Sequence, residues 1–240
     1  MRNADQSDAP AVNQALPEPL PAEPLSIFRK WFDDAHRLAV QPNPNAMSLA
    51  TIGEDGTPNV RIVLCKRLLG DGCLVFFTNY EGGKGRELRA RPKAAVCFHW
   101  DGLDRQVRMQ GYVTISPSEE SDEYFASRPL MSRVAAWASS QSTPIDSRAA
   151  LLAKLNDMER RFGVDLERDG ARTGADSPKV PRPPNWGGYR FWPTRVELWV
   201  GSVGRLHDRA AWERRLEPAT VDSADGYRAA SEWACTRLQP

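Results

Sequence analysis

Short apolar runs, rich in β-branched residues and separated by tight polar turns, occupy most of the chain. The run 47–52 ends at Glu54-Asp55-Gly56, and Gly70-Asp71-Gly72 separates the next two runs. Closely spaced strands joined by such turns are typical of antiparallel hairpins. The pattern predicts strands over 47–52, 59–66, 73–78, 94–100, 105–115, 188–192, 195–200, 212–216 and 233–238.

Helical periodicity interrupts the strands in a few places. Residues 25–39 place Phe28, Trp31 and Phe32 on one face, which predicts an amphipathic helix lying on a core. Further helices are expected over 85–90, 118–126, 130–138 and 147–162. Many short strands with inserted helices indicate an α+β domain built on an antiparallel barrel.

Three segments lack periodicity. Residues 1–23 are rich in Ala, Pro, Asp and Gln, and we expect a disordered tail there. Residues 163–185 and 217–230 are expected to be long loops. The predicted organisation is therefore a tail over 1–23 and a single domain over 24–240.

The charge balance and the hydropathy pattern exclude several classes of protein. The chain has 32 Lys and Arg against 31 Asp and Glu, whereas a general nucleic-acid-binding protein has a strong basic excess. No apolar run approaches the ~20 residues of a membrane helix, and the N-terminus does not have the pattern of a secretory signal. We expect a cytoplasmic protein that binds neither nucleic acid nor membrane.

The four cysteines and three histidines do not have the spacing of a metal site. Cys65, Cys73 and Cys97 sit inside apolar runs, and none of the cysteines forms a CxxC pair. Buried, reduced thiols in a cytosolic protein are the interpretation, and no metal site is expected.

Two basic tracts are candidates for binding an anion. Lys84 and Arg86 follow a Gly-rich turn whose backbone N–H groups could meet a phosphate, although a surface loop with solvated charges explains them equally well. If the tract 205–209 is extended, Arg205, His207 and Arg209 share one face. This face is either an anion site or an edge strand paired with carboxylates.

Other cofactor and nucleophile motifs are absent from the sequence. There is no GxSxG, HExxH or GxGxxG, which argues against a Rossmann cofactor site. Phe77, Trp137 and Trp199 lie near the basic tracts and are more often core residues than a cofactor platform. Basic groups together with aromatic rings suit a flat, phosphorylated ligand. Composition and spacing alone do not identify this ligand.

A set of ordered segments resembles one family, that of pyridoxine/pyridoxamine 5′-phosphate oxidase. Each segment alone is weak, but their order and spacing from Pro44 to Pro240 are specific. The segments are NAM (45–47), RIVLCK (61–66), FFTN (76–79), KGREL (84–88), RQV (105–107), YFASRP (124–129), QS (141–142), NWGGY (185–189), VELWVG (196–201), RLHDR (205–209) and RLQP (237–240).

The resemblance implies an FMN-binding split barrel that forms a homodimer with flavin at the subunit interface. The implied activity is oxidation of pyridoxamine or pyridoxine 5′-phosphate to pyridoxal 5′-phosphate, with O₂ as acceptor and H₂O₂ as product. The implied FMN contacts are Arg61, Ile62, Val63, Leu64, Lys66, Phe77, Thr78, Lys84, Gln106, Gln141, Ser142, Trp199 and Arg209. The implied substrate contacts are Lys66, Tyr124, Arg128, Ser132, Arg205 and His207, with Arg205 and His207 orienting the reacting ring.

The chain departs from the family pattern in particular places. Gly82-Gly83 stands where many members have Ser-Arg before the lysine, so one guanidinium near the FMN phosphate is missing. The loops 164–181 and 217–230 are longer than usual. Two alternatives stay open: a related flavin oxidase of a phenazine-type pathway, and a split-barrel module that binds flavin or pyridoxal phosphate without catalysis.

Overall fold

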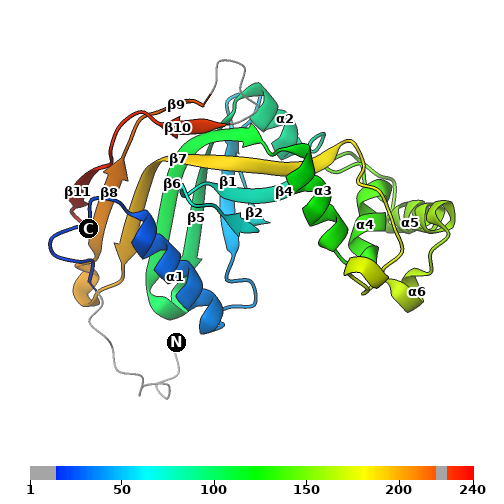
Figure 1. Ribbon diagram of the computed structural model, residues 1–240, viewed down its shortest axis with the longest axis horizontal. Coiled ribbons are helices and arrows are strands. Elements are labelled where there is room, and N and C mark those ends of the chain that lie inside the picture. Colours follow the sequence, from blue (N-terminus) through cyan, green and yellow to red (C-terminus); the bar gives the residue numbers. More distant parts are fainter. Residues whose placement is uncertain (1–14, 220–225) are drawn as a thin grey trace.

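The computed structural model describes residues 15–219 and 226–240. Its centre is a nine-stranded antiparallel sheet with the order β11-β8-β7-β6-β5-β1-β2, in which β4 pairs with β7 and with β3. The sheet curls into a half-barrel (Figure 1). This confirms the α+β split barrel predicted from the sequence. The strands are β1 (Ala46–Ile52), β2 (Pro58–Leu64), β3 (Arg67–Leu68), β4 (Leu74–Asn79), β5 (Lys93–Trp100), β6 (Arg105–Ile115), β7 (Trp186–Val200), β8 (Asp208–Glu213) and β11 (Ala234–Leu238), and β9 (Leu216–Pro218) pairs with β10 (Tyr227–Ala229).

Strand β7 makes the curl possible. Its first part pairs with β4 and its last part with β8, while β6 accompanies it along its length. Two separate strands, 188–192 and 195–200, were expected here. Pro193, which cannot donate a ladder hydrogen bond, lies between them. In the structure Pro193 lies opposite Gly111, where the register shifts at a β-bulge. A Cβ at Gly111 would lie 2.1 Å from the Trp192 carbonyl oxygen, so this close approach requires glycine.

Helix α1 (Leu25–Arg37) covers the inner face of the sheet (Figure 1). Phe28 and Phe98 pack with ring centroids 5.4 Å apart, and Phe28, Phe98 and Trp100 are fully buried. The predicted helix ran to Ala39, but the helix ends earlier, and Ala39 has a positive φ of 47°. Within the described residues, no helix is both long and apolar enough to cross a membrane.

Of the remaining helices, α2 (Gly83–Ala90) lies against β1, and the others gather beyond one end of the sheet (Figure 1). These others are α3 (Ser118–Ser127), α4 (Leu130–Ala138), α5 (Arg148–Phe162) and α6 (Leu166–Asp169). Leu130, Val134, Leu166 and Val180 form a second, smaller core there. The segment 163–185, expected to be a loop, therefore contributes α6 and part of this core.

The expectation of a disordered tail is wrong for residues 15–23. Leu16 is only 4% exposed in the main core, and its backbone N–H donates to Asp208 Oδ2 at 2.7 Å. Trp212 Nε1 donates to the Pro21 carbonyl at 2.9 Å, and Arg237 pairs with Glu18 at 2.8 Å. These partners are far away in the sequence, so no local periodicity could indicate them. Residues 1–14 of the predicted tail lie outside the described residues.

Replacing Leu16 by Ala should lower the free energy of unfolding by about 2–3 kcal/mol, because it deletes a buried side chain and leaves a cavity. Urea unfolding of the flavin-free protein measures the change. Leu152→Ala is the matched control, since Leu152 is 46% exposed on α5. Equal effects of the two substitutions would show that residues 15–23 do not stabilise the fold.

Candidate functional site

A cavity of about 310 Å³ opens between β2, β4, α3 and the segment that follows α4. Strands β2 and β4 present neighbouring side chains to it, and α3 closes one side. It is lined by Ile62, Val63, Leu64, Lys66, Phe77, Thr78, Lys84, Tyr124, Arg128, Gln141 and Trp186. Every lining residue except Trp186 belongs to the contacts implied by the sequence resemblance, so the structure brings these residues together.

One wall of the cavity consists of parallel aromatic rings. Phe77 and Tyr124 stack with centroids 4.0 Å apart and an interplanar angle of 18°, and Trp186 lies 5.7 Å from Phe77 at 11°. Parallel flat rings suit a planar ligand. The sequence does not indicate Trp186 as a site residue, although Trp186 lies in the segment NWGGY. Its role depends on the packing of α3 against β7, which no sequence spacing indicates.

Lys84 forms the cationic end of the cavity. It lies in the first turn of α2, and its ammonium donates to Gln141 Oε1 at 2.8 Å and to Thr78 Oγ1 at 3.1 Å. Burial lowers the pKa of Lys84, and the nearby charge of Arg61 lowers it further. Gly82 leaves room for Gln141, because a Cβ at Gly82 would lie 2.5 Å from Gln141 Oε1.

A second cation, Arg128, lies near the aromatic wall. Its guanidinium stands over the Trp186 ring, 4.5 Å from the centroid, and burial lowers its pKa. Its buried Nη1 has no hydrogen-bond partner among the described residues. A buried cationic donor without a partner is costly, so this atom favours an anionic ligand. The Lys66 ammonium lies 5.9 Å from the centroid of the Tyr124 ring and adds positive charge.

Three further expected residues do not line the cavity. Arg61, on β2, forms an ion pair with Glu87 of α2 at 3.0 Å. Ser142 has a positive φ of 66°, and its Oγ lies 3.7 Å from the position that a Cβ would occupy at Gly83. Ser132 is on α4, four residues after Arg128.

A second group of expected residues lies on three adjacent strands, β6, β7 and β8. Gln106 is paired with Trp199, and Trp199 with Arg209. Arg209 already forms an ion pair with Glu197 at 2.7 Å and donates to the Gln239 carbonyl at 2.9 Å. The charge of Arg209 is therefore partly compensated within the chain.

The prediction that Arg205, His207 and Arg209 share one face of a strand is wrong. Residues 203–205 form a 3₁₀ turn, with φ of 71° at Gly204 and 63° at Arg205, and β8 begins only at Asp208. These left-handed conformations break the alternation that an extended chain would give. The His207 ring instead packs on Trp199, with centroids 4.6 Å apart, and its Nδ1 accepts the Ser202 backbone N–H at 3.2 Å.

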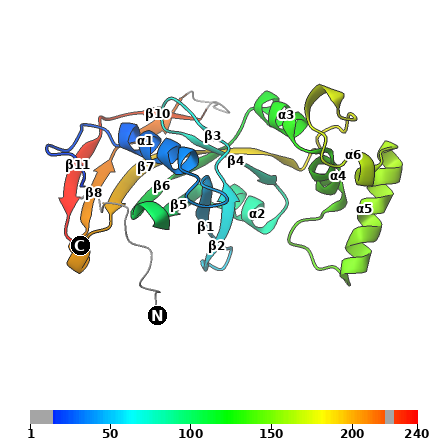
Figure 2. The same cartoon turned by 90° about the horizontal axis from the view of Figure 1, so that it is seen from below.

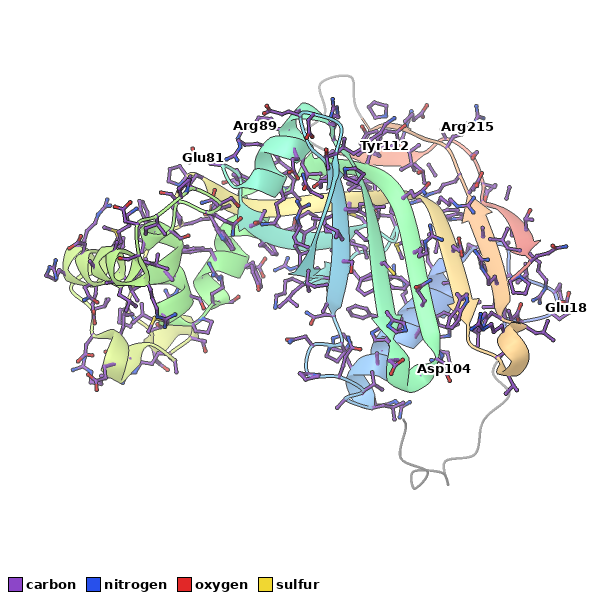
Figure 3. All side chains as sticks on the ribbon, turned by 180° about the vertical axis from the view of Figure 1, so that it is seen from behind. Glu18, Glu81, Arg89, Asp104, Tyr112 and Arg215 are labelled. Carbon is purple, nitrogen blue, oxygen red and sulfur yellow. The ribbon has the colours of Figure 1, made fainter. Side chains whose placement is uncertain are left out.

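The two groups lie apart within one chain. The cavity residues include Lys84 of α2, and Glu81 lies just before this helix. The second group adjoins Asp104, whose carbonyl accepts the Gly201 N–H at 2.7 Å. Figure 3 shows Glu81 and Asp104 at different ends of the sheet. None of the second group lines the cavity.

Family models match both parts of the chain. The model described as Pyridoxamine 5′-phosphate oxidase matches residues 32–161, and the model described as Pyridoxine 5′-phosphate oxidase C-terminal dimerisation region matches residues 186–240. The chain belongs to the pyridoxamine 5′-phosphate oxidase family. The family is one of oxidoreductases, and the dimerisation region indicates a homodimer.

Named members of the family extend the similarity over most of the chain. The chain is 46% identical over 218 residues to the pyridoxine/pyridoxamine 5′-phosphate oxidase of Burkholderia lata, which covers 91% of this chain and 89% of that protein. The protein of the same name from Cupriavidus metallidurans is 45% identical over 218 residues, with the same coverage.

Solved structures of the same fold include PhzG of Burkholderia lata in complex with tetrahydrophenazine-1-carboxylic acid. It has a TM-score of 0.75 and 27% identity, covering 92% of this chain and 94% of that one. A pyridoxamine 5′-phosphate oxidase-related, FMN-binding protein of Nostoc punctiforme has a TM-score of 0.60 at 17% identity, over 87% and 94% of the two chains. The second likeness shows the fold alone.

Proposed function

We propose that this family member oxidises pyridoxamine 5′-phosphate and pyridoxine 5′-phosphate to pyridoxal 5′-phosphate, using FMN, with O₂ as acceptor and H₂O₂ as product. The observation that carries the proposal is the unpaired Nη1 of Arg128, buried beside parallel aromatic rings and near Lys66. A phosphate meets the need of that donor, and the rings suit a flat heterocycle.

The residues present fit FMN. Lys84 and the turn before α2 offer charge and N–H groups to a phosphate, and β2 and β4 supply an edge for a flat ring. In this proposal one subunit holds FMN with Arg61, Ile62, Val63, Leu64, Lys66, Phe77, Thr78, Lys84, Gln141 and Ser142. The remaining FMN contacts, at positions 106, 199 and 209, come from the partner subunit.

The homodimer is part of the proposal because each chain carries its two groups apart. Ile62 is 64% exposed and Val60 is 71% exposed, although both are apolar residues on β2 next to the cavity. Such an exposed apolar strand beside a site is typical of an interface. A two-fold dimer would place the residues on β6, β7 and β8 of one subunit over the cavity of the other. The symmetry then gives two equivalent sites in each dimer.

In the mechanism, the chain binds and orients the substrate. Lys66, Tyr124, Arg128 and Ser132 hold the substrate phosphate, and Arg205 and His207 orient the ring so that its C4′ carbon faces the flavin. FMN, when bound, supplies the hydride acceptor and returns the electrons to O₂. The neutral tautomer of His207 keeps its proton on Nε2, because Nδ1 accepts the Ser202 N–H. Nε2–H is therefore available to hydrogen-bond a substituent of the ring.

The direct test is a flavin spectrum of the purified protein followed by an assay of pyridoxal phosphate and H₂O₂ formation from each substrate. We expect turnover of both phosphorylated substrates. A protein that binds flavin or pyridoxal phosphate and consumes no O₂ with either substrate would be the non-catalytic module instead.

The structural likeness to PhzG supports a second candidate, a flavin oxidase of tricyclic phenazine precursors. The same chain is more similar in sequence to proteins named as pyridoxine/pyridoxamine 5′-phosphate oxidases. The half-buried cations Lys84 and Arg128 of the cavity also favour a phosphorylated substrate. Faster turnover of a tetrahydrophenazine carboxylate than of pyridoxine phosphate would favour the second candidate.

We expect Lys84→Ala to weaken FMN binding by at least tenfold, about 1.4 kcal/mol. The reason is that Gly83 has no side chain to share the attraction for the FMN phosphate. Fluorescence titration of the apoprotein with FMN measures the effect. Arg89→Ala is the matched control, an exposed cation on the same helix. Unchanged affinity in Lys84→Ala would mean that the phosphate is held elsewhere.

The role of Arg209 should differ from that of Arg205 and His207. Arg205→Ala or His207→Ala should depress turnover while FMN stays bound, because small displacements of the reacting ring are costly. Arg209→Ala should weaken FMN binding, and excess FMN should restore part of its activity. Each variant is titrated with FMN and assayed with pyridoxine phosphate. Loss of flavin in Arg205→Ala with retention in Arg209→Ala would reverse the roles.

A further inference from the structure

Arg133, on α4, is a buried cation outside the candidate active site. The residue as a whole is only 3% exposed. Nη1 donates to the Pro178 carbonyl at 3.0 Å and Nη2 to the Ser177 hydroxyl, while the buried Nε has no hydrogen-bond partner in the described part of the chain. Both partners are neutral, so they leave the charge uncompensated.

The buried carboxylate of the neighbouring α6 is already paired. Asp169 contacts Arg168 at 2.7 Å and Arg172 at 3.2 Å. Among the described residues, Arg133 has no ion pair within 4.0 Å, to Asp169 or any other carboxylate. Burying a charge without a counter-charge is unfavourable unless something else compensates it.

A cavity of about 640 Å³ adjoins the Arg133 side chain. The segment that leads into β7 forms one side of it. This segment passes beside α3 (Figure 2). The cavity is lined by Ala126, Ser127, Arg133, Gly174, Ser177, Lys179, Val180 and Pro181. This set contains a second cation, two hydroxyls and several apolar groups, and no carboxylate. It shares no residue with the lining of the substrate cavity.

The longer segment 164–181 builds much of this cavity. It supplies Gly174, Ser177, Lys179, Val180 and Pro181, and Trp137 Nε1 fixes it by donating to the Pro181 carbonyl at 2.7 Å. The segment is thus held against α4 around a positive charge. The volume exceeds what a bare inorganic anion needs, and the apolar lining suits a short carbon skeleton.

We propose that this cavity is a second ligand site, which binds a small organic anion through Arg133 and Lys179. The class is a carboxylate or phosphomonoester with a short apolar body. The anionic head would meet Arg133, Lys179 and the hydroxyls of Ser127 and Ser177. The apolar body would lie on Val180 and Pro181.

The test is calorimetric titration of the FMN-loaded protein at constant ionic strength, with inorganic phosphate and glycerol phosphate in one arm and succinate in the other. All titrations use the Arg128→Ala background, which weakens binding in the substrate cavity. We expect saturable binding in at least one arm. Arg133→Gln should weaken it at least tenfold, and Lys179→Ala about three- to fivefold, because Lys179 is exposed.

Lys154→Ala is the matched control, since it removes an exposed lysine from α5, away from the cavity, and should change nothing. Lys179→Ala keeps the test valid if Arg133→Gln does not fold. The proposal is overturned if no probe binds saturably, or if Lys179→Ala and Lys154→Ala bind alike. It is also overturned if Lys66→Ala abolishes the binding, because the ligand then occupies the substrate cavity. A failure of the proposed oxidase activity would leave these titrations unaffected.

Discussion

Arg128→Ala should lower kcat/KM for pyridoxine phosphate by about 100-fold or more while FMN stays bound. Charge-assisted hydrogen bonds are worth roughly 1.5–3 kcal/mol each, and a guanidinium can make two of them to one phosphate. In this protein the effect should be large because Arg128 Nη1 is buried and has no hydrogen-bond partner among the described residues. Steady-state oxidation of pyridoxine phosphate, followed through H₂O₂, measures it.

The unphosphorylated vitamin provides the internal control. Pyridoxine lacks the group that Arg128 would bind, so Arg128→Ala should change the rate of pyridoxine oxidation little. Arg182→Ala controls for the loss of a nearby arginine, since Arg182 pairs with Asp122 at 2.6 Å and does not line the cavity. Equal losses for pyridoxine and its phosphate would mean that Arg128 acts on folding or on the flavin. The proposal that the substrate is phosphorylated would then lose its main structural argument.

The strands could be predicted from the sequence because their determinants are local. The runs 47–52 and 105–115 alternate or cluster apolar residues between turns, and they lie where β1 and β6 were found. The continuity of β7 could not be predicted in this way. Pro193 indicates a break, and only its pairing with Gly111 at the bulge makes the strand continuous. Residues 15–23 have the composition of a tail, and their order depends on Asp208, Trp212 and Arg237.

The residues of the candidate cavity could be predicted through ordered motifs, and the details of their packing could not. The resemblance identifies Lys84 and Arg128, and the structure brings both to one cavity. Trp186 was not identified as a cavity residue, because its ring reaches Phe77 and Tyr124 only once β7 and α3 are packed. The prediction that Arg205 and His207 share one face was wrong for a local reason, which is the left-handed turn at Gly204. The sequence carried a hint of it, because glycine adopts that conformation without steric cost.

A mixed dimer should regain activity from two inactive chains. Arg128 lines the cavity, whereas Arg205 lies in the turn before β8 and does not line it. In a dimer of one Arg128→Ala chain and one Arg205→Ala chain, two-fold symmetry gathers both defects in one site and leaves the other site intact. Such dimers, purified through two different affinity tags, should show about half of the wild-type activity. Either variant alone should be almost inactive.

The matched control pairs two variants from the same group. A mixed dimer of Arg128→Ala and Lys66→Ala has one damaged cavity in each subunit, so neither site is intact and no activity should return. If Arg128 and Arg205 served the same site from one chain, the first mixed dimer would also stay inactive. Recovery in the first mixture and its absence in the second would require that each site takes its cavity from one subunit and Arg205 from the other. That arrangement explains why the residues for one flat phosphorylated ligand lie apart on a single curled sheet.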